Sequence, residues 1–301
     1  MIQYLQIGTH LKKGKNMITP LVGISKIINQ YSTIVVGFNG VISDGKNISF
    51  DAVKALGQTK LAGKNVILLS NSGLRISQIA KILTDHKVPL SIFSQIMTAG
   101  EMVHYMLKNK VKNFNISGKK YYQIGQKYDN AIMQGLDFEQ TEDINKADFL
   151  FVAGGTTEDT LAKHLPVLSY AVSLSLPMIC VGNDISSFDN EQICNAPGAF
   201  AEQYATLGGN FITFGKPEVE MLKYVLEDFQ NVPNSEILMI GDNIQTDVKL
   251  AFLYGIDSVL VAKGVHIKFL GEGYIPDVQK AKNLASTYDV YPQYTISELR
   301  W

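Results

Sequence analysis

The amino-acid sequence predicts an α/β fold: a doubly wound parallel sheet of the Rossmann-like kind with an inserted α/β cap domain. Several short runs are rich in β-branched and aliphatic residues. Each is followed by a loop of Gly, Ser, Asn or Asp and then by a segment with apolar residues at helical spacing. Runs of this kind are typical of strands buried on both faces of a parallel sheet. A further complete set of strands and helices between residues 94 and 195 predicts the cap.

The first predicted strand covers residues 34–36 and ends at Gly37, Phe38 and Asn39. In open α/β sheets, ligands bind just beyond the carboxyl ends of the strands. These three residues are therefore expected at the point of reaction. The segment before the strand, residues 21–31, has apolar residues at helical spacing and predicts a helix packed against the sheet.

Three later stretches repeat this layout and place polar or charged residues at the same edge of the sheet. The residues concerned are Ser70 and Asn71 after residues 65–69, Lys216 in a Gly-Lys-Pro-Glu helix start, and Asp242 and Asp247 after residues 236–240. The chain therefore carries, in order, a first strand loop, a Ser/Asn loop, a lysine and a pair of carboxylates.

This order of motifs resembles the haloacid dehalogenase (HAD) superfamily. The spacing resembles its class IIA subgroup, which carries a C2-type cap between the Ser/Asn and Lys motifs. The resemblance covers nearly the whole chain from about Met17. Phosphatases of sugar phosphates, nucleotides, nitrophenyl phosphate and pyridoxal phosphate resemble the chain at this level. The resemblance implies a Mg²⁺-dependent phosphatase of small phosphorylated metabolites.

The first motif departs from the family pattern, in which Asp-x-Asp is usual. Gly37 stands at the position of the nucleophile, and Asn39 at that of the general acid/base. Glycine has no side chain to attack phosphorus, and an amide does not titrate near neutral pH. We therefore expect weak or absent phosphatase activity; the alternative is a non-catalytic protein that binds a phosphate ligand or a partner. Asp44, the nearest carboxylate, is expected in the flap beyond the strand tip.

The resemblance implies that the fourth motif, Asp242 and Asp247, binds a metal ion. Asp242 and Asp247, with the backbone carbonyl of Asn39, would hold Mg²⁺, a hard ion that prefers oxygen ligands. Because the first-motif carboxylate is missing, we expect this binding to be weakened. The alternative is ordinary turn and helix N-cap chemistry, for which Asp is favoured at helix starts.

The Ser/Asn and Lys motifs imply an anion site. Ser70 and Asn71 would bind phosphoryl oxygens through a hydroxyl and backbone N–H groups, and Lys216 would neutralise the negative charge. The alternatives are a plain turn and a solvated surface lysine. Asn183 and Asp184 stand where relatives have Asn-Pro-Asp, a loose match that leaves their roles open.

The resemblance divides the chain into an N-terminal extension, a core in two parts and a cap. These are residues 1–16, residues 17–93 and 196–301, and residues 94–195, respectively. Cap loops such as residues 154–159 would set the substrate, and their chemistry is too generic to identify it.

The composition indicates a soluble globular protein, expected in the cytoplasm. The 27 Lys and Arg residues nearly equal the 28 Asp and Glu residues, so no broad attraction for nucleic acid is expected. No apolar stretch approaches the ~20 residues of a membrane span, and the N-terminus has no signal-peptide pattern.

Cys180 and Cys194 are too few for a disulfide framework and are expected as free thiols. The partners implied are a small phosphorylated molecule and a second copy of the chain in a homodimer, with no nucleic acid and no membrane.

Overall fold

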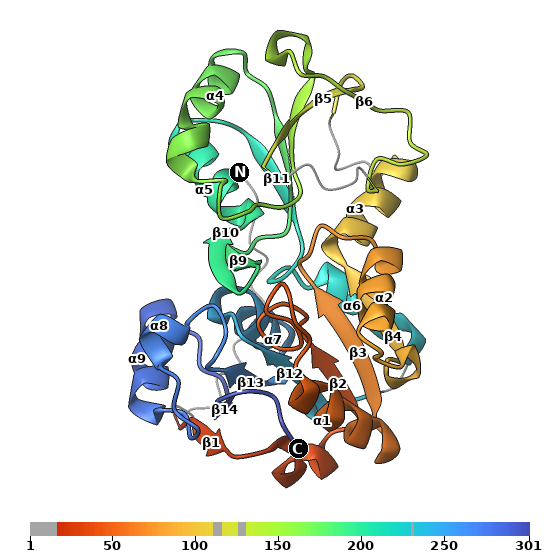
Figure 1. Cartoon of the computed structure of the whole chain (residues 1–301), viewed down its shortest axis with the longest axis vertical. Coiled ribbons are helices and arrows are strands. Elements are labelled where there is room, and N and C mark those ends of the chain that lie inside the picture. Colours follow the sequence, from red (N-terminus) through yellow and green to blue (C-terminus); the bar gives the residue numbers. More distant parts are fainter. Residues whose placement is uncertain (1–16, 111–115, 126–130, 230–231) are drawn as a thin grey trace.

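The computed structural model describes residues 17–110, 116–125, 131–229 and 232–301. They form two lobes, each built on its own parallel sheet (Figure 1). The predicted N-terminal extension, residues 1–16, lies outside the described residues. None of the helices in the described residues combines the length and apolar character needed to span a membrane.

The larger sheet has seven strands, each parallel to its neighbours. Strand β2, which precedes Gly37, lies between β12 and β3, and all of its residues are buried. The strand order is β1 (Thr19–Leu21), β14 (Tyr294–Ile296), β13 (Asp257–Val261), β12 (Ile237–Gly241), β2 (Thr33–Val36), β3 (Asn65–Ser70) and β4 (Gln95–Thr98).

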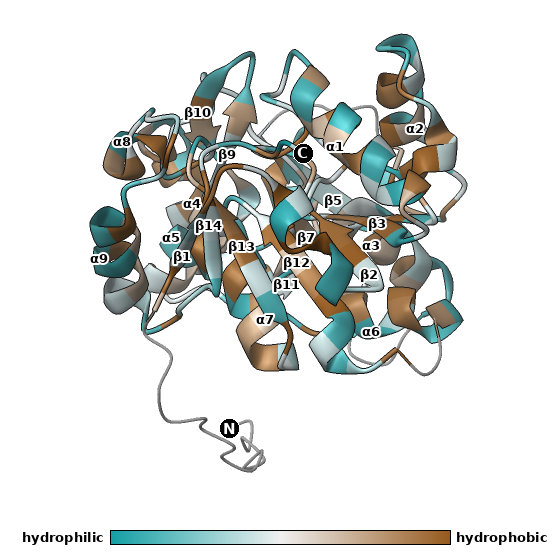
Figure 2. Cartoon of the chain, turned by 90° about the horizontal axis from the view of Figure 1, so that it is seen from below, coloured by the Kyte–Doolittle hydropathy of each residue, from teal (hydrophilic) through white to brown (hydrophobic). Residues whose placement is uncertain are grey.

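Helices cover both faces of this sheet, which confirms the predicted doubly wound α/β architecture. Alternate residues of β2 point to opposite faces, so Ile34 and Val36 pack in one hydrophobic cluster and Val35 packs in another. The first cluster includes α1 (Phe50–Leu61) and α2 (Ile76–Asp85), and the second includes α3 (Ala99–Lys108), α6 (Glu220–Leu226) and α7 (Lys249–Tyr254). Helices α8 (Ile267–Leu270) and α9 (Val278–Tyr288) pack beside β13 in a further cluster. In Figure 2 the strands of this sheet are mainly hydrophobic, whereas the helices around it are mixed.

The smaller sheet has five parallel strands and forms the upper lobe of Figure 1. Its strands are β11 (Phe211–Phe214), β8 (Met178–Val181), β7 (Phe149–Val152), β5 (Lys120–Ile124) and β6 (Glu139–Gln140), in that order. Helices α4 (Leu161–Ser173) and α5 (Pro197–Thr206) pack against it. An antiparallel hairpin of β9 (Ser186–Asp189) and β10 (Gln192–Asn195) lies between the two lobes.

The strands of the smaller sheet do not follow the limits predicted for the cap. Strand β4 lies inside the predicted cap of residues 94–195 but belongs to the larger sheet, because it pairs with β3. Helix α5 and strand β11 lie in the predicted core segment 196–301 but belong to the smaller lobe, because β11 pairs with β8 and α5 packs against both strands. The smaller sheet therefore draws its strands from Lys120 to Phe214.

The segment before β2 forms two short 3₁₀ turns in place of the helix predicted over residues 21–31. The turns cover Ile24–Lys26 and Ile28–Gln30. Their apolar side chains are buried against the sheet, as the helical spacing predicted. Gly23 is extended, and a Cβ built on it would lie 2.2 Å from the carbonyl oxygen of Trp301. Glycine at position 23 therefore allows Trp301 to pack closely against this segment.

Candidate functional site

A cavity of about 70 Å³ lies between the two lobes, beyond the carboxyl ends of β2, β3 and β12. The larger sheet contributes the strand ends that the sequence predicted, and the smaller lobe contributes the loops after β7 and β8 and the β9–β10 hairpin. The predicted site residues that line the cavity together are Asn39, Ser70, Asn71, Lys216, Asp242 and Asp247.

Lys216 is the buried cation of this cavity. Its side chain is 5% exposed, and its ammonium donates to Asp247 Oδ1 at 2.6 Å and to the Leu69 carbonyl at 2.9 Å. Burial alone would lower the pKa of Lys216, but the carboxylates of Asp247 and Asp184 raise it above its ordinary value. The alternative of a solvated surface lysine is therefore wrong, and Lys216 provides a fixed positive charge.

The loop after β12 buries two carboxylates. Asp247 Oδ2 accepts a hydrogen bond from the Asn243 N–H at 3.1 Å, and Asp242 Oδ2 accepts one from the Val265 N–H at 2.8 Å. Burial and the nearby charge of Asp247 raise the pKa of Asp242 well above its usual range. The following helical turn is capped by Asn243, whose side chain accepts from the Gln245 N–H at 2.9 Å. Asn243 is therefore the N-cap residue. Asp247 accepts from the N–H of this residue as well as from Lys216, whereas Asp242 bonds to Val265 and does not cap the turn.

The Ser/Asn loop after β3 contains two residues with different contacts. Asn71 holds the backbone of Lys216: its Nδ2 donates to the Lys216 carbonyl at 2.9 Å, and its Oδ1 accepts from the Lys216 N–H at 2.7 Å. The Asn71 side chain is therefore engaged within the protein. Ser70 Oγ accepts a hydrogen bond from the Ser72 N–H at 3.1 Å, which leaves the hydroxyl proton available for donation.

Gly37 lies at the end of β2, where its N–H donates to the Ile240 carbonyl at 2.9 Å. A Cβ built on Gly37 would have its nearest contact at 3.4 Å and would lie 3.8 Å from Asp247 Oδ1, so a Cβ fits there without a close contact. Two residues later, Asn39 Nδ2 donates to Ser187 Oγ of the hairpin at 3.2 Å. The position of the missing nucleophile therefore retains its space.

Asp44 lies in the loop beyond the strand tip, as expected. Its Oδ1 accepts hydrogen bonds from the backbone N–H groups of Lys46 at 2.9 Å and Asn47 at 2.6 Å. Asp44 is not among the described residues that line the cavity with Lys216. Its carboxylate shapes the loop and is not placed to replace the nucleophile.

Asp184 is a cavity residue whose role the sequence left open. Its Oδ1 accepts hydrogen bonds from Thr246 Oγ1 at 2.6 Å and Asn243 Nδ2 at 3.0 Å, so it joins the loop after β8 to the loop after β12. Burial and the charge of Asp247 raise the pKa of Asp184 to about 6, against the opposing effect of Lys216. The signal in the sequence was its place in the loop that follows a predicted strand, as in the other motifs.

Two family models match the chain: one described as haloacid dehalogenase-like hydrolase over residues 34–139, and one described as HAD-hydrolase-like over residues 213–285. The matched segments contain the strand ends that line the cavity. The chain belongs to the haloacid dehalogenase superfamily. The inserted lobe between the Ser/Asn and Lys motifs agrees with the class IIA subgroup that the sequence resembles.

Solved structures of HAD proteins share this fold. A haloacid dehalogenase-like hydrolase from Brucella suis 1330 has a TM-score of 0.77 at 24% identity, covering 92% of this chain and 98% of its own. A possible sugar phosphatase from Cytophaga hutchinsonii has a TM-score of 0.71 at 19% identity, covering 92% of this chain and 96% of its own. A p-nitrophenyl phosphatase from Archaeoglobus fulgidus has a TM-score of 0.62 at 17% identity, covering 89% of this chain and 97% of its own. A comparison with curated proteins gives no match.

HAD proteins generally use Mg²⁺, and the donor atoms of this site fit a hard cation with few protein ligands. Within the described residues, no three His, Cys, Asp or Glu side chains are arranged to hold a metal ion. Asp242, Asp247 and the carbonyl of Asn39 would offer oxygen atoms only, the ligands that Mg²⁺ prefers, and water would complete its coordination. A Cβ at Gly40 would lie 1.9 Å from Asp242 Oδ2, so glycine preserves the space of this carboxylate.

His266 makes this site sensitive to acid. Its Nε2 accepts a hydrogen bond from the Ile244 N–H at 3.2 Å, which requires the neutral ring, and burial lowers its pKa from 6.5 to about 4. The folded protein thus binds fewer protons than the unfolded chain between these values. The neutral His266 ring therefore contributes to the free energy of unfolding in full above pH 6.5. This contribution is lost as the pH falls to about 4.

We expect the free energy of unfolding to fall by up to roughly 3 kcal/mol from this group between pH 6.5 and 4. The variant His266→Gln retains an acceptor and removes the titration, so its stability should depend less on pH in denaturant titrations. His86→Gln, at an exposed position, is the matched control and should behave as wild type. An unchanged pH dependence in His266→Gln would contradict this assignment.

Proposed function

We propose that this HAD protein binds a small phosphate monoester in the cavity between its lobes and has lost most or all of the hydrolytic step. The observation that carries the proposal is the combination of Gly37 with an otherwise assembled site. Position 37 has space for a Cβ but provides no nucleophile. Beside it, the ammonium of Lys216 and the carboxylate of Asp247 form an ion pair with a separation of 2.6 Å. The rival function is a weak phosphatase that uses another nucleophile.

The anion would lie between Lys216 and the Ser/Asn loop. The buried ammonium supplies positive charge, and the Ser70 hydroxyl and the backbone N–H groups of its loop supply donors. Asn71 acts by holding the backbone of Lys216. Among the described residues that line the cavity, Lys216 is the single Lys or Arg. The site thus suits one phosphoryl group.

The names of the structural neighbours supply suitable probes. One is called a p-nitrophenyl phosphatase and another a possible sugar phosphatase. Both names describe phosphate monoesters, the ligand class that the proposed anion site would accept. Inorganic phosphate is the smallest probe of this class.

A calorimetric titration with inorganic phosphate in the presence of Mg²⁺ tests this proposal. We expect saturable binding to the wild type and about tenfold weaker binding to Ser70→Ala, because a hydrogen bond to a charged group contributes about 1.5 kcal/mol. Ser173→Ala, which removes a hydroxyl that donates to the Tyr170 carbonyl in α4, is the matched control and should bind as wild type. Absence of saturable binding to the wild type would overturn the proposal.

Magnesium is proposed as an aid to ligand binding, because it would offset the charge between the two aspartates and the phosphate. We expect Mg²⁺ binding to be measurable and weak, since one carboxylate of the family motif is missing. In calorimetry the variant Asp242→Asn should bind Mg²⁺ at least about tenfold more weakly than the wild type. Identical titrations of the two proteins would remove Asp242 from the metal site.

A further inference from the structure

The wall of the cavity on the side of the smaller lobe is built mainly from small residues and backbone, with Phe188 as its large side chain. The loop between β7 and α4 contributes Ala153, Gly154 and Gly155. The hairpin contributes Ser186, Ser187 and Phe188. Because glycine has no side chain, the position of the peptide groups at 154 and 155 sets the shape of this wall. Whatever fixes this backbone therefore controls the space left for a ligand.

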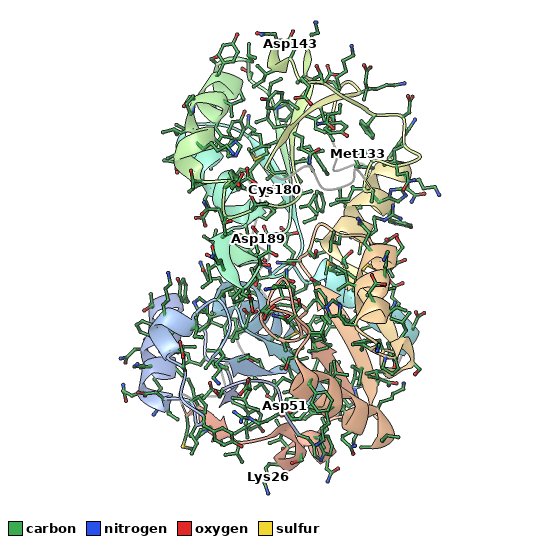
Figure 3. The ribbon with its side chains drawn as sticks, in the orientation of Figure 1. Lys26, Asp51, Met133, Asp143, Cys180 and Asp189 are labelled. Carbon is green, nitrogen blue, oxygen red and sulfur yellow. The ribbon has the colours of Figure 1, made fainter. Side chains whose placement is uncertain are left out.

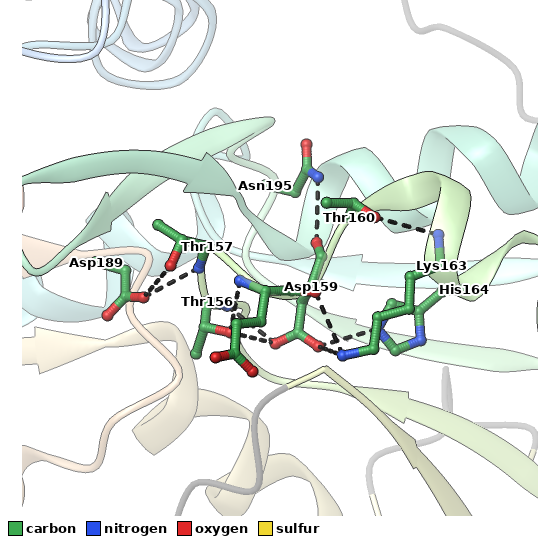
Figure 4. Close-up of polar contacts among 9 residues, drawn as sticks. Thr156, Thr157, Asp159, Thr160, Lys163, His164, Asp189 and Asn195 are labelled. Atoms are coloured by element: carbon green, nitrogen blue, oxygen red, sulfur yellow. Dashed lines mark hydrogen bonds and ion pairs between the residues drawn. The ribbon is translucent and has the colours of Figure 1, made fainter.

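Asp159 is the centre of the contacts that fix this loop (Figure 4). Its carboxylate is buried: Oδ2 accepts hydrogen bonds from the N–H and Oγ1 of Thr156 at 3.0 and 2.9 Å, and Oδ1 accepts one from His164 Nε2 at 3.0 Å. The ammonium of Lys163 lies 3.8 Å from the same oxygen. Burial alone would raise the pKa of Asp159, but the bonds from His164 and Thr156 lower it, which indicates a stable charged form.

The β9–β10 hairpin also holds this loop. Asp189 Oδ2 accepts a hydrogen bond from the Thr157 N–H at 3.0 Å, and Asn195 Nδ2 donates to the backbone carbonyl of Asp159 at 3.2 Å. A Cβ built on Gly155 would lie 2.4 Å from the Asn195 carbonyl oxygen. The loop is thus fixed between α4 and the hairpin, with no space for a larger residue at 155.

We propose that Asp159 is a positioning residue for ligand selectivity, which holds the Gly154–Gly155 backbone as a rigid wall and restricts the cavity to compact phosphates without a second charged group. The cavity volume of about 70 Å³ lies below the ~300–1,000 Å³ of typical small-molecule pockets. The wall presents no cation to a second anionic group in its described residues. Asp159 does not line the cavity itself and acts through the loop. This inference rests on the proposed phosphate-binding function.

Two measurements on Asp159→Ala and the conservative Asp159→Asn test the proposal. Hydrogen exchange of the amides at 154–157, measured without ligand, should be about tenfold or more faster in Asp159→Ala and intermediate in Asp159→Asn. Calorimetry with inorganic phosphate and p-nitrophenyl phosphate should show that the preference for the smaller probe falls by about tenfold in Asp159→Ala. The control is Asp143→Ala, which removes a similar capping carboxylate at the far end of the smaller lobe (Figure 3). It should change neither result.

The outcomes separate this inference from the proposed function. Phosphate binding by the wild type, with exchange and selectivity unchanged in both Asp159 variants, would overturn the inference alone. Loss of affinity for both probes by the same factor would also overturn it, because a merely structural role predicts no change in selectivity. If the wild type binds neither probe, the proposed function is wrong, and so is the proposed ligand selectivity. Hydrogen exchange needs no ligand, so it would still show whether Asp159 fixes the loop at residues 154–157.

Discussion

Replacing Gly37 and Asn39 together by aspartate is expected to raise the hydrolysis of phosphomonoesters by several orders of magnitude. Loss of a catalytic nucleophile costs on the order of 10⁶ in kcat, or about 8 kcal/mol of transition-state stabilisation. The Cβ of residue 37 would lie 3.8 Å from Asp247 Oδ1 without backbone movement. An aspartate there would begin beside Asp247, whose charge Lys216 offsets across a 2.6 Å ion pair. An aspartate at 39 would supply a proton donor.

Two matched variants separate chemistry from packing in this experiment. Gly37→Asn with Asn39→Asp adds the same volume at position 37 without a nucleophile and should stay near the wild-type rate. Asn39→Asp alone should also stay there, because no group attacks phosphorus. The readout is release of p-nitrophenol with Mg²⁺. If the double aspartate variant remains inactive on a panel of phosphates while still binding inorganic phosphate, the site has diverged beyond its first motif.

Replacing Lys216 by methionine is expected to reduce the free energy of unfolding by about 3–5 kcal/mol, because it leaves the charge of Asp247 buried without its partner. Both side chains of this pair are at most 5% exposed. Lys46→Met, in the exposed pair with Glu191 at 3.1 Å, is the matched control and should cost less than about 1 kcal/mol.

The double variant Lys216→Met with Asp247→Asn removes both charges of the buried pair and should recover much of the lost stability. Denaturant titrations of the wild type, Lys216→Met, Asp247→Asn and the double variant give the result as a double-mutant cycle. Equal destabilisation by Lys216→Met and Lys46→Met would show that the buried pair is not a distinct stabilising contact.

The sequence was sufficient for the fold class because the decisive signals are local. The run before Gly37 and the runs before Ser70 and Asp242 are short, apolar and followed by polar turns. Parallel strands of this kind need a sheet with both faces covered, and their carboxyl ends meet at one edge. The structure accordingly brings the residues at these strand ends into one cavity.

The features that the sequence did not predict depend on contacts between distant segments. The limits of the smaller lobe were missed because the pairing of β11 with β8 cannot be read from either strand alone. The contribution of Asp184 depends on bonds to Asn243 and Thr246, about sixty positions away in the chain. The use of the Asn71 side chain to hold Lys216 likewise joins residues 145 positions apart.

The most direct test of the central claim is ³¹P NMR of p-nitrophenyl phosphate mixed with stoichiometric wild-type protein and Mg²⁺. We predict a shifted or broadened signal of the bound ester and no release of inorganic phosphate above the uncatalysed background, because position 37 provides no nucleophile. Turnover of the ester at several per second would contradict the account. Another nucleophile would then have to be sought among the carboxylates of the cavity, Asp184 first.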